Sequence, residues 1–328
     1  MAVQDLKLHD AVTSFFQARR PQLRPRKGGE PFLTLTLGDR TGELAGVMWE
    51  GAGPIGERLQ EGDIVKVQGV VGSYQGNLQL VIQRLRVAEP PEVKIEDFLP
   101  TTTGDVAAMM AAIEATAESF TEPALKHLVQ GVLTDLEIRK RFMTAPAAVG
   151  IHHAYLGGLA EHTLSVLRLC QLMADHYGPV VQRDLLLTSA ILHDVGKLFE
   201  LRYDRVFEYT DEGRLLGHIT EGVLFLEKRI AADPDFPEPL RQQLLHNVLS
   251  HHGEYEWGSP KRPKTLEALI LHSVENLDGK VNLFLRLMRE HVDPSRPEWT
   301  SYDRGLGRPL YRAGLDAETG GEEELPPQ

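Results

Sequence analysis

The sequence has almost no cysteine and no long apolar run. Cys170 is the single cysteine in 328 residues, which excludes an internal disulfide and a cysteine-based zinc cluster. It lies in the apolar run LSVLRLCQLM, so we predict a buried structural thiol rather than a nucleophile. No stretch approaches about 18 consecutive apolar residues, so no membrane span is expected. The first residues, MAVQDLKLHD, are too polar for a secretory signal. We therefore expect a cytoplasmic protein.

Basic residues are outnumbered by acidic ones, 35 against 47, and the charge is unevenly distributed. The net charge of −12 argues against a protein covered in nucleic-acid-binding surface. Residues 1–90 are nearly neutral, with 11 Lys and Arg against 10 Asp and Glu, so the acidity belongs to the rest of the chain. One local basic cluster consists of Arg19, Arg20, Arg24, Arg26 and Lys27. It could be a solvated loop or a phosphate-binding segment, and both interpretations remain open.

The first 90 residues carry the pattern of a small β-barrel. From Thr34 to about Ala88 apolar residues alternate with polar ones, and Gly-rich turns separate the segments. Together with AVTSFFQARR this predicts about five strands, which is typical of an OB-type barrel over residues 1–90. OB barrels bind single strands through aromatic side chains beside basic ones. The candidate residues for this role are Phe32, Trp49, Tyr74, Arg24 and Arg26. The three aromatic rings could instead belong to the barrel core.

A linker and a helical domain follow the barrel. The segment EPPEVKIEDFLPTTTG is rich in Pro, Glu and Thr, which predicts a linker over residues 91–104. Beyond it, apolar residues recur at helical spacing and predict an all-α domain over residues 105–315. We expect a small hairpin within RYDRVFEYTDEGRLL and a disordered acidic tail over residues 316–328. Helices are predicted near 159–177, 183–199, 217–231, 238–252 and 264–291.

One motif carries the chemistry: AILHDVGKL, residues 190–198. On the predicted apolar helix, His193 and Asp194 cannot both face a core without a partner for the charge. A divalent metal is such a partner, because imidazole and carboxylate are ligands for Zn, Mn and Fe. Lys197 follows on the same helical side, where it could reach a substrate phosphate. His162 and Asp278, on two other predicted helices, complete a mixed nitrogen and oxygen ligand set.

This ordered set resembles the HD-domain metal-dependent phosphohydrolases over roughly residues 145–292. The resemblance implies a helical bundle that hydrolyses phosphoesters with metal-activated water. In binuclear members further histidines hold a second ion, and His218, His251 and His252 stand at the matching places, with Asp194 as the bridge. Gly158 occupies the place where a third ion would often need a carboxylate, so we expect two ions at most.

The whole chain resembles the YhaM-type 3′→5′ exoribonucleases over nearly all of residues 1–312. The runs that carry the resemblance are HHAYLGGLAEHTLSV, HDVGKL, GHITEG, SHHGEYEWGSPKRP and LHSVENLDGK. It implies removal of nucleotides from the 3′ end of single-stranded RNA, with DNA left open as a further substrate, and with manganese favoured over Fe, Zn, Co, Ni or Mg. The substrate contacts within these runs would be His152, His153, Tyr155, Lys261 and Arg262, although packing or solvated roles also fit.

Two other functions fit parts of the pattern. The chain could be an HD phosphohydrolase or phosphodiesterase that acts on nucleotides or cyclic nucleotides, but such an enzyme does not need the barrel. It could also be a binding protein, but the intact ligand set speaks against an inactive site. The physiological metal, the choice between RNA and DNA and the presence of a homo-oligomer stay open.

Overall fold

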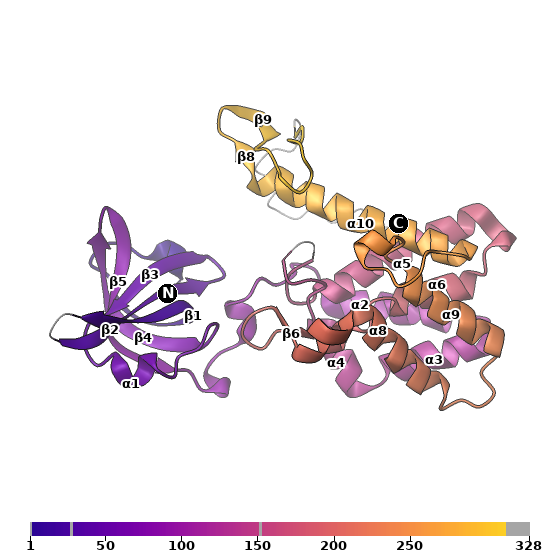
Figure 1. Ribbon diagram of the computed structural model, residues 1–328, viewed down its shortest axis with the longest axis horizontal. Helices are drawn as coiled ribbons and strands as arrows, with labels where there is room; N and C mark the ends of the chain where they lie inside the picture. The colour runs from indigo at the N-terminus through magenta and orange to yellow at the C-terminus, as the bar shows by residue number, and fades with distance from the viewer. Residues whose placement is uncertain (1, 27–28, 151–152, 313–328) are drawn as a thin grey trace.

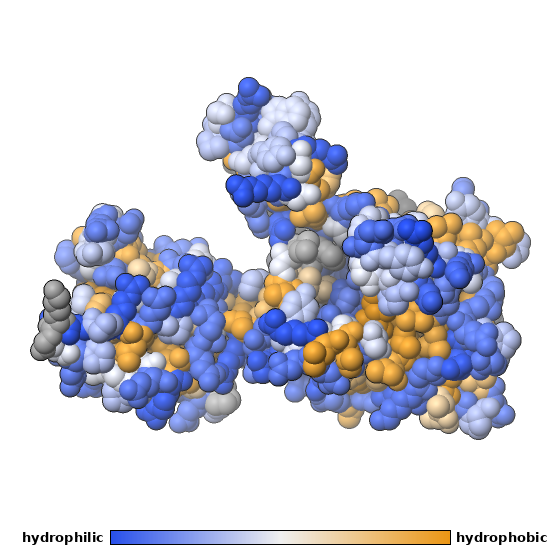
Figure 2. Space-filling model, viewed as in Figure 1, coloured by the Kyte–Doolittle hydropathy of each residue, from blue (hydrophilic) through white to orange (hydrophobic). Residues whose placement is uncertain are grey.

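The computed structural model describes residues 2–26, 29–150 and 153–312. A β-barrel and a helical bundle lie side by side (Figure 1), which confirms the predicted order of an OB-type barrel before an all-α domain. The visible face of both bodies is largely hydrophilic, with apolar areas on the bundle (Figure 2). Among the described residues, no helix is both long enough and apolar enough to cross a membrane. The predicted disordered tail at 316–328 lies outside the described residues.

The barrel closes in the strand order β1-β2-β3-β5-β4. Its inner face alternates with its outer face as the period-two pattern predicts: Leu33, Leu35 and Leu37 of one strand are all buried. At Gly69 a β carbon would lie 2.3 Å from the Val81 carbonyl oxygen, so the backbone of neighbouring strands meets closely there. The elements are β1 (Ala11–Arg26), β2 (Gly29–Asp39), β3 (Gly42–Met48), α1 (Gly53–Gly56), β4 (Ile64–Tyr74) and β5 (Asn77–Val87).

The basic cluster forms part of a strand, so the loop interpretation is wrong for its described members. Strand β1 continues to Arg26 and pairs with β2, with register shifts between Arg19 and Gln22 and between Arg24 and Arg26. Pro21 and Pro25 stand at these irregularities, where a strand tolerates the missing N–H. The two prolines therefore made a paired strand look like a loop in the sequence. Lys27 lies outside the described residues.

Apolar faces of successive helices form the core of the bundle. Helix α6 is buried over most of its length and α5 mainly over its first half, and Cys170 lies within this core, where burial raises the pKa of its thiol to about 12. The helices are α2 (Val106–Glu118), α3 (Pro123–Leu133), α4 (Leu136–Thr144), α5 (Gly158–Tyr177), α6 (Arg183–Leu192), α7 (Lys197–Glu200), α8 (Asp211–Ile230), α9 (Glu238–Ser250) and α10 (Leu266–Glu290).

Three local features differ from the predicted helices. The helix expected over 183–199 is two helices, because α6 ends at Leu192 and the chain turns before α7 begins at Lys197. Helix α8 is interrupted at Gly217, whose φ of +73° lies in the left-handed region, so a second helical segment begins at His218. An unpredicted hairpin, β8 (Val292–Asp293) and β9 (Arg296–Thr300), follows α10, which projects beyond the bundle (Figure 1).

A second small hairpin contacts the barrel. It consists of β6 (Leu201–Arg202) and β7 (Glu208–Tyr209), within the predicted hairpin segment. At its tip the Arg205 guanidinium lies 2.9 Å from Asp63 Oδ1, and the Arg205 carbonyl accepts a hydrogen bond of 2.6 Å from Gln17 Nε2. Since the hairpin joins α7 to α8, the barrel is attached to the segment between His193 and His218.

The two apolar cores predict two unfolding transitions. The barrel core contains Phe16 and the bundle core contains Phe142, and the two buried clusters have no residue in common. We expect Phe16→Ala to destabilise the barrel by about 3–5 kcal/mol, through lost burial and the cavity left behind, while the bundle transition stays in place. Calorimetry checks this, with Phe142→Ala as the reciprocal control. An equal shift of both transitions in each variant would show that barrel and bundle unfold as one unit.

Candidate metal centre

The bundle brings six of the seven predicted metal ligands together at the ends of its helices. His162 lies in the first turns of α5, His193 caps the C-terminus of α6, and Asp194 follows in the turn. The other three come from the second segment of α8 and the end of α9: His218, His251 and His252. At Gly196 a β carbon would lie 1.9 Å from the His218 carbonyl oxygen, so the turn after α6 can pack against α8 only with glycine there.

A first group of ligand atoms contains two imidazoles and a carboxylate. The Nε2 atoms of His162 and His193 lie 3.3 Å apart, and Asp194 Oδ2 lies 3.5 Å from the first and 3.3 Å from the second. His193 Nδ1 lies 2.9 Å from the Ala190 carbonyl oxygen. A carbonyl only accepts, so Nδ1 carries a hydrogen, and Nε2 is the ring atom that faces the group.

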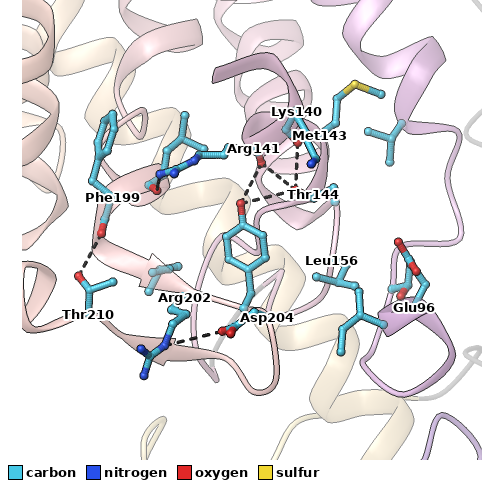
Figure 3. A pocket seen from close by; sticks show the side chains of 17 residues that line it. Glu96, Lys140, Arg141, Met143, Thr144, Leu156, Phe199, Arg202, Asp204 and Thr210 are labelled. Atoms are coloured by element: carbon cyan, nitrogen blue, oxygen red, sulfur yellow. Dashed lines mark hydrogen bonds and ion pairs between the residues drawn. The ribbon is translucent and has the colours of Figure 1, made fainter. Parts of the chain in front are cut away.

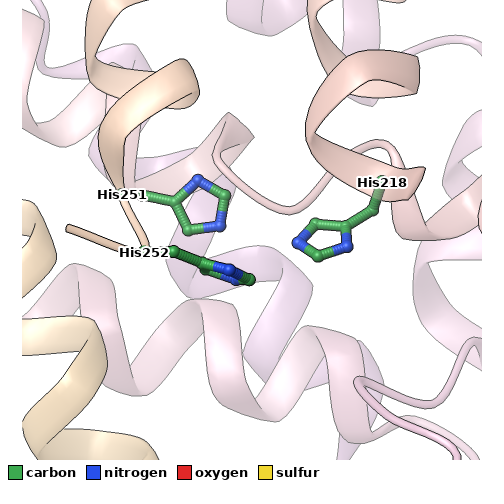
Figure 4. A group of neighbouring side chains, drawn as sticks. All are labelled: His218, His251 and His252. Carbon is green, nitrogen blue, oxygen red and sulfur yellow. The ribbon is translucent and has the colours of Figure 1, made fainter. Parts of the chain in front are cut away.

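A second group contains three imidazoles and the other oxygen of Asp194. His218, His251 and His252 converge (Figure 4), and Asp194 Oδ1 lies 3.6 Å from His218 Nε2 and 3.7 Å from His251 Nε2. Each ring is oriented through its Nδ1, as is usual for imidazoles that bind metals. The Nδ1 partners are Glu200 Oε1 at 3.1 Å, the Val248 carbonyl at 2.7 Å and the Trp257 carbonyl at 3.1 Å, respectively.

The buried polar atoms of these groups fit a bound cation. Among the described residues, both oxygens of Asp194 and the Nε2 atoms of His218 and His251 are buried without a hydrogen-bond partner. Lys197 Nζ lies 2.6 Å from Asp194 Oδ2 as an ion pair, but not at a hydrogen-bonding angle. Unsatisfied buried polar atoms are costly and rare. A divalent ion would satisfy them, because this set of nitrogen and oxygen donors suits Mn, Fe or Zn.

The protonation states of three imidazoles also suit metal binding. Burial lowers the pKa of His162 to about 4 and that of His252 to about 4, and it lowers the pKa of His251 well below its ordinary value. These imidazoles are therefore neutral near pH 7 and can bind a metal without losing a proton. His193 differs, because burial would lower its pKa but the charge of Asp194 outweighs that effect and raises it, so a metal there must displace a proton. Burial opposes ionisation of Asp194, but Lys197 and His193 outweigh it, so its pKa is well below the ordinary range and the carboxylate is charged.

Asp278, the seventh predicted ligand, lies behind His162. Its Oδ2 is 2.8 Å from His162 Nδ1 and 3.4 Å from His153 Nε2, and its Oδ1 accepts a hydrogen bond from Ser165. Burial would raise its pKa, but the hydrogen bonds from His153 and His162 outweigh that effect and lower it. In this arrangement Asp278 orients the His162 ring, and its role as a direct ligand stays a prediction.

Glu275, which the sequence argument did not include, lies close enough to Asp194 and His193 to interact with their charges. Burial and the nearby charge of Asp194 raise its pKa to about 7. It stands three residues before Asp278 on α10, and the only signal in the sequence is this second acid on a helix with an apolar face. Glu275 is therefore an additional candidate ligand.

The predicted substrate contacts of the bundle have varied surroundings. Lys197 is buried against Asp194 rather than open to a phosphate. Lys261 is exposed, whereas Arg262 pairs with Glu254 at 2.7 Å and its guanidinium lies over the Tyr255 ring. His153 and Tyr155 lie beside Asp278 in a hydrogen-bonded chain, and His152 lies outside the described residues.

The barrel carries an aromatic pair with a basic side chain beside it. The rings of Phe32 and Trp49 stack with their centroids 4.8 Å apart, and the Arg26 guanidinium lies 5.9 Å from the Trp49 ring. Trp49 remains 44% exposed, and Tyr74 is exposed at the end of β4. Arg24 is also exposed, and it donates a hydrogen bond to Gln22. An exposed ring backed by a second ring is a suitable platform for a base.

A separate cavity of about 760 Å³ lies beside the linker and the β6–β7 hairpin (Figure 3). The described residues that line it include Lys140, Arg141 and Thr144 of α4 and Leu198 and Phe199 of α7, but none of the predicted metal ligands. Tyr203 also lines it, with its hydroxyl 3.4 Å from the Arg141 carbonyl oxygen. The cavity is therefore distinct from the metal centre.

Two family profiles match the two bodies. The profile described as HD domain matches residues 159–280, and the profile described as OB-fold nucleic acid binding domain matches residues 17–88. The fold and the site thus define an HD-domain phosphohydrolase preceded by an OB-fold domain.

Curated relatives are similar over nearly the whole chain. The 3'-5' exoribonuclease YhaM of Geobacillus sp. (strain WCH70) is 38% identical over 298 residues, which cover 89% of this chain and 90% of that protein. The 3'-5' exoribonuclease YhaM of Bacillus subtilis (strain 168) is 40% identical over 270 residues, which cover 81% and 83%. The chain belongs to the YhaM family of 3′-5′ exoribonucleases.

Matches to solved structures are weaker. The HD domain of the phosphodiesterase PgpH of L. monocytogenes matches with 18% identity and a TM-score of 0.29, over 45% of this chain and 74% of that chain. The second OB-fold domain of replication protein A from Methanococcus maripaludis matches with 22% identity and a TM-score of 0.23, over 27% and 94%.

The second group predicts a change in metal stoichiometry. His251→Ala removes an imidazole from that group only, so we expect the number of bound Mn²⁺ ions to fall from two to one. Isothermal titration calorimetry of the apoprotein measures this number. His246→Ala is the matched control, because His246 lies on the same helix but accepts a hydrogen bond from the Lys264 N–H, away from the centre. One bound ion in the unaltered protein would contradict the two-ion assignment.

Proposed function

We propose that this chain carries out the family's reaction, removing nucleotides one at a time from the 3′ end of single-stranded RNA at a two-metal centre. One observation carries the two-metal part of the proposal. Asp194 presents one carboxylate oxygen to His162 and His193 and the other to His218 and His251, at 3.3–3.7 Å. A carboxylate placed between two groups of imidazoles is suited to bridge two ions.

The chain's own residues supply the ligands. His162, His193 and Asp194 would hold the first ion, with Glu275 or Asp278 as a further oxygen donor. His218, His251 and His252 would hold the second ion together with Asp194. Bound divalent ions supply a water of lowered pKa and neutralise charge on the phosphate. Glu200 and the Val248 and Trp257 carbonyls fix the three rings of the second group, so the ligands are oriented before a metal arrives.

The barrel would hold the strand while the bundle cuts it. The acidic bundle repels a polyanion at long range, so a strand-holding module with exposed arginines is useful. Phe32, Trp49 and Tyr74 would stack on bases, while Arg24 and Arg26 would contact phosphates. Exposed Lys261 would extend these contacts on the bundle. We propose manganese as the favoured metal and DNA as a second substrate. The same protein preparations serve to test for a homo-oligomer.

The primary test is a product ladder. With a 5′-labelled single-stranded oligoribonucleotide and Mn²⁺, we expect fragments that shorten stepwise, and no shortening after treatment with EDTA. Asp194→Asn should lower the rate at least 100-fold, because it removes the charge placed between the two groups. Asp175→Asn is the matched control, since Asp175 pairs with Arg183 at the surface, away from the centre.

The same assay separates the alternative function. Faster turnover of free nucleotides or cyclic nucleotides than of a 10-residue RNA would identify a small-molecule phosphohydrolase. A ladder that begins at the 5′ end, or cleavage at internal sites, would overturn the 3′→5′ direction. Matched RNA and DNA strands in parallel lanes decide the substrate preference.

The barrel platform predicts a separate kinetic effect. Stacking of a base on an aromatic side chain contributes about 1–3 kcal/mol, so Trp49→Ala should raise the KM for a long strand roughly 5- to 150-fold. The value of kcat should stay within twofold, because the metal centre is unchanged. Trp299→Ala is the control, since Trp299 lies in β9 and packs against Tyr311. An unchanged KM in Trp49→Ala would remove this ring from the strand path.

A further inference from the structure

A chain of hydrogen bonds leads from the linker toward the metal centre. Thr102 Oγ1 donates to Glu161 Oε2 at 2.5 Å, and the Tyr155 hydroxyl donates to Glu161 Oε1 at 2.8 Å. The Tyr155 oxygen lies 2.7 Å from His153 Nδ1. The Tyr155 oxygen is thus held between Glu161 and His153.

The chain continues from His153 to a metal-site imidazole. His153 is 5% exposed, and its Nε2 lies 3.4 Å from Asp278 Oδ2. The same oxygen is 2.8 Å from Nδ1 of His162, and Ser165 holds the other carboxylate oxygen. The position of the His162 ring therefore depends on Asp278, and the position of Asp278 depends on His153.

At the linker end of this series of hydrogen bonds, backbone hydrogen bonds hold Thr102 in place. The Thr102 N–H donates to the Leu156 carbonyl at 2.9 Å, and the Leu156 N–H donates to the Pro100 carbonyl at 2.8 Å. Gly157 has a φ of +80°, and a β carbon on it would lie 2.7 Å from Thr102 Cγ2. The linker thus packs closely against the turn that precedes α5, and Thr102 cannot move without disturbing that turn.

We infer that Thr102, Glu161, Tyr155 and His153 form a positioning relay, which orients Asp278 and His162 and connects the linker to the metal centre. The inference rests on the proposed metal centre. It assigns His153 and Tyr155 a role different from the substrate contact that their place in the sequence suggests. Their polar side-chain atoms contact other members of the relay, so they act on the reaction through the proposed metal ligand His162.

The relay connects the two bodies in a defined way. Thr102 lies in the segment that leads from the barrel to the bundle, and the barrel also contacts the β6–β7 hairpin through Arg205. A displacement of the linker alters the first hydrogen bond of the relay, and the effect reaches His162 through groups in direct contact. The metal centre is thereby sensitive to the position of the linker.

Removal of one hydroxyl tests the relay in the full-length protein. Tyr155→Phe keeps the ring but breaks the contacts with Glu161 and His153. Because loss of a residue that orients a metal ligand typically costs 10- to 100-fold in affinity or activity, we expect about tenfold weaker Mn²⁺ binding by calorimetry. On 5′-labelled RNA, kcat should fall about tenfold while KM stays within twofold.

The control makes the same chemical change elsewhere. Tyr203→Phe removes a hydroxyl that contacts Thr144 and the Arg141 carbonyl, outside the relay, so Mn²⁺ affinity and kcat should not change. A second pair examines the linker end: Thr102→Val should weaken Mn²⁺ binding, and Thr102→Ser, which keeps the hydroxyl, should restore it. Thermal melting shows whether each variant is folded, and the Thr102 pair decides the question if Tyr155→Phe does not fold.

The outcomes separate the relay from the proposed function. Mn²⁺ affinity at the level of the unaltered protein in both Tyr155→Phe and Thr102→Val overturns the relay. A raised KM with unchanged kcat in Tyr155→Phe also overturns it, because that result identifies a substrate contact. If the unaltered protein binds Mn²⁺ but does not degrade RNA, the proposed function fails while the affinity measurements still test the relay. Without Mn²⁺ binding in the unaltered protein, both fail.

Discussion

The candidate metal site is arranged around one buried carboxylate. Asp194 sits in a turn at the centre of the bundle with imidazoles on both sides, and its charged form is held by Lys197 and His193. A charge at this depth is tolerated only with compensating partners. The need for these partners constrains where the neighbouring helices begin and end. The turn must leave α6 at His193, Gly196 must lack a side chain so that α8 can approach, and α8 must restart at His218.

Sequence patterns predicted the architecture where a period repeats. The alternation through Leu33, Leu35 and Leu37 predicted a barrel strand, and the paired His193 and Asp194 predicted the centre. Features that depend on single positions were harder to predict. Pro21 and Pro25 made the second half of β1 hard to predict. The apolar run before His193 gave no indication that the helix ends there, and Gly196 was only a weak indication.

The surroundings of Asp278 show why ligand geometry could not be read from the sequence. Glu275 and Asp278 lie three residues apart on α10, so their side chains point in directions that differ by only about 60° around the helix. That Asp278 contacts His162, while Glu275 does not, is decided by how α10 packs against α5 and α6. That rotation is a property of the assembled core, and no local pattern encodes it.

The lone thiol has a consequence for how the protein responds to oxidants. Cys170 is buried in the bundle core, and burial raises its pKa to about 12, so it carries almost no thiolate at neutral pH. The proposed ligands are all imidazole and carboxylate, which peroxide does not convert into disulfides or sulfenic acids as it does cysteine. Thiol-directed reagents such as iodoacetamide or disulfide-exchange compounds therefore have no accessible target, and the ligand set of the centre is indifferent to the thiol redox balance around it.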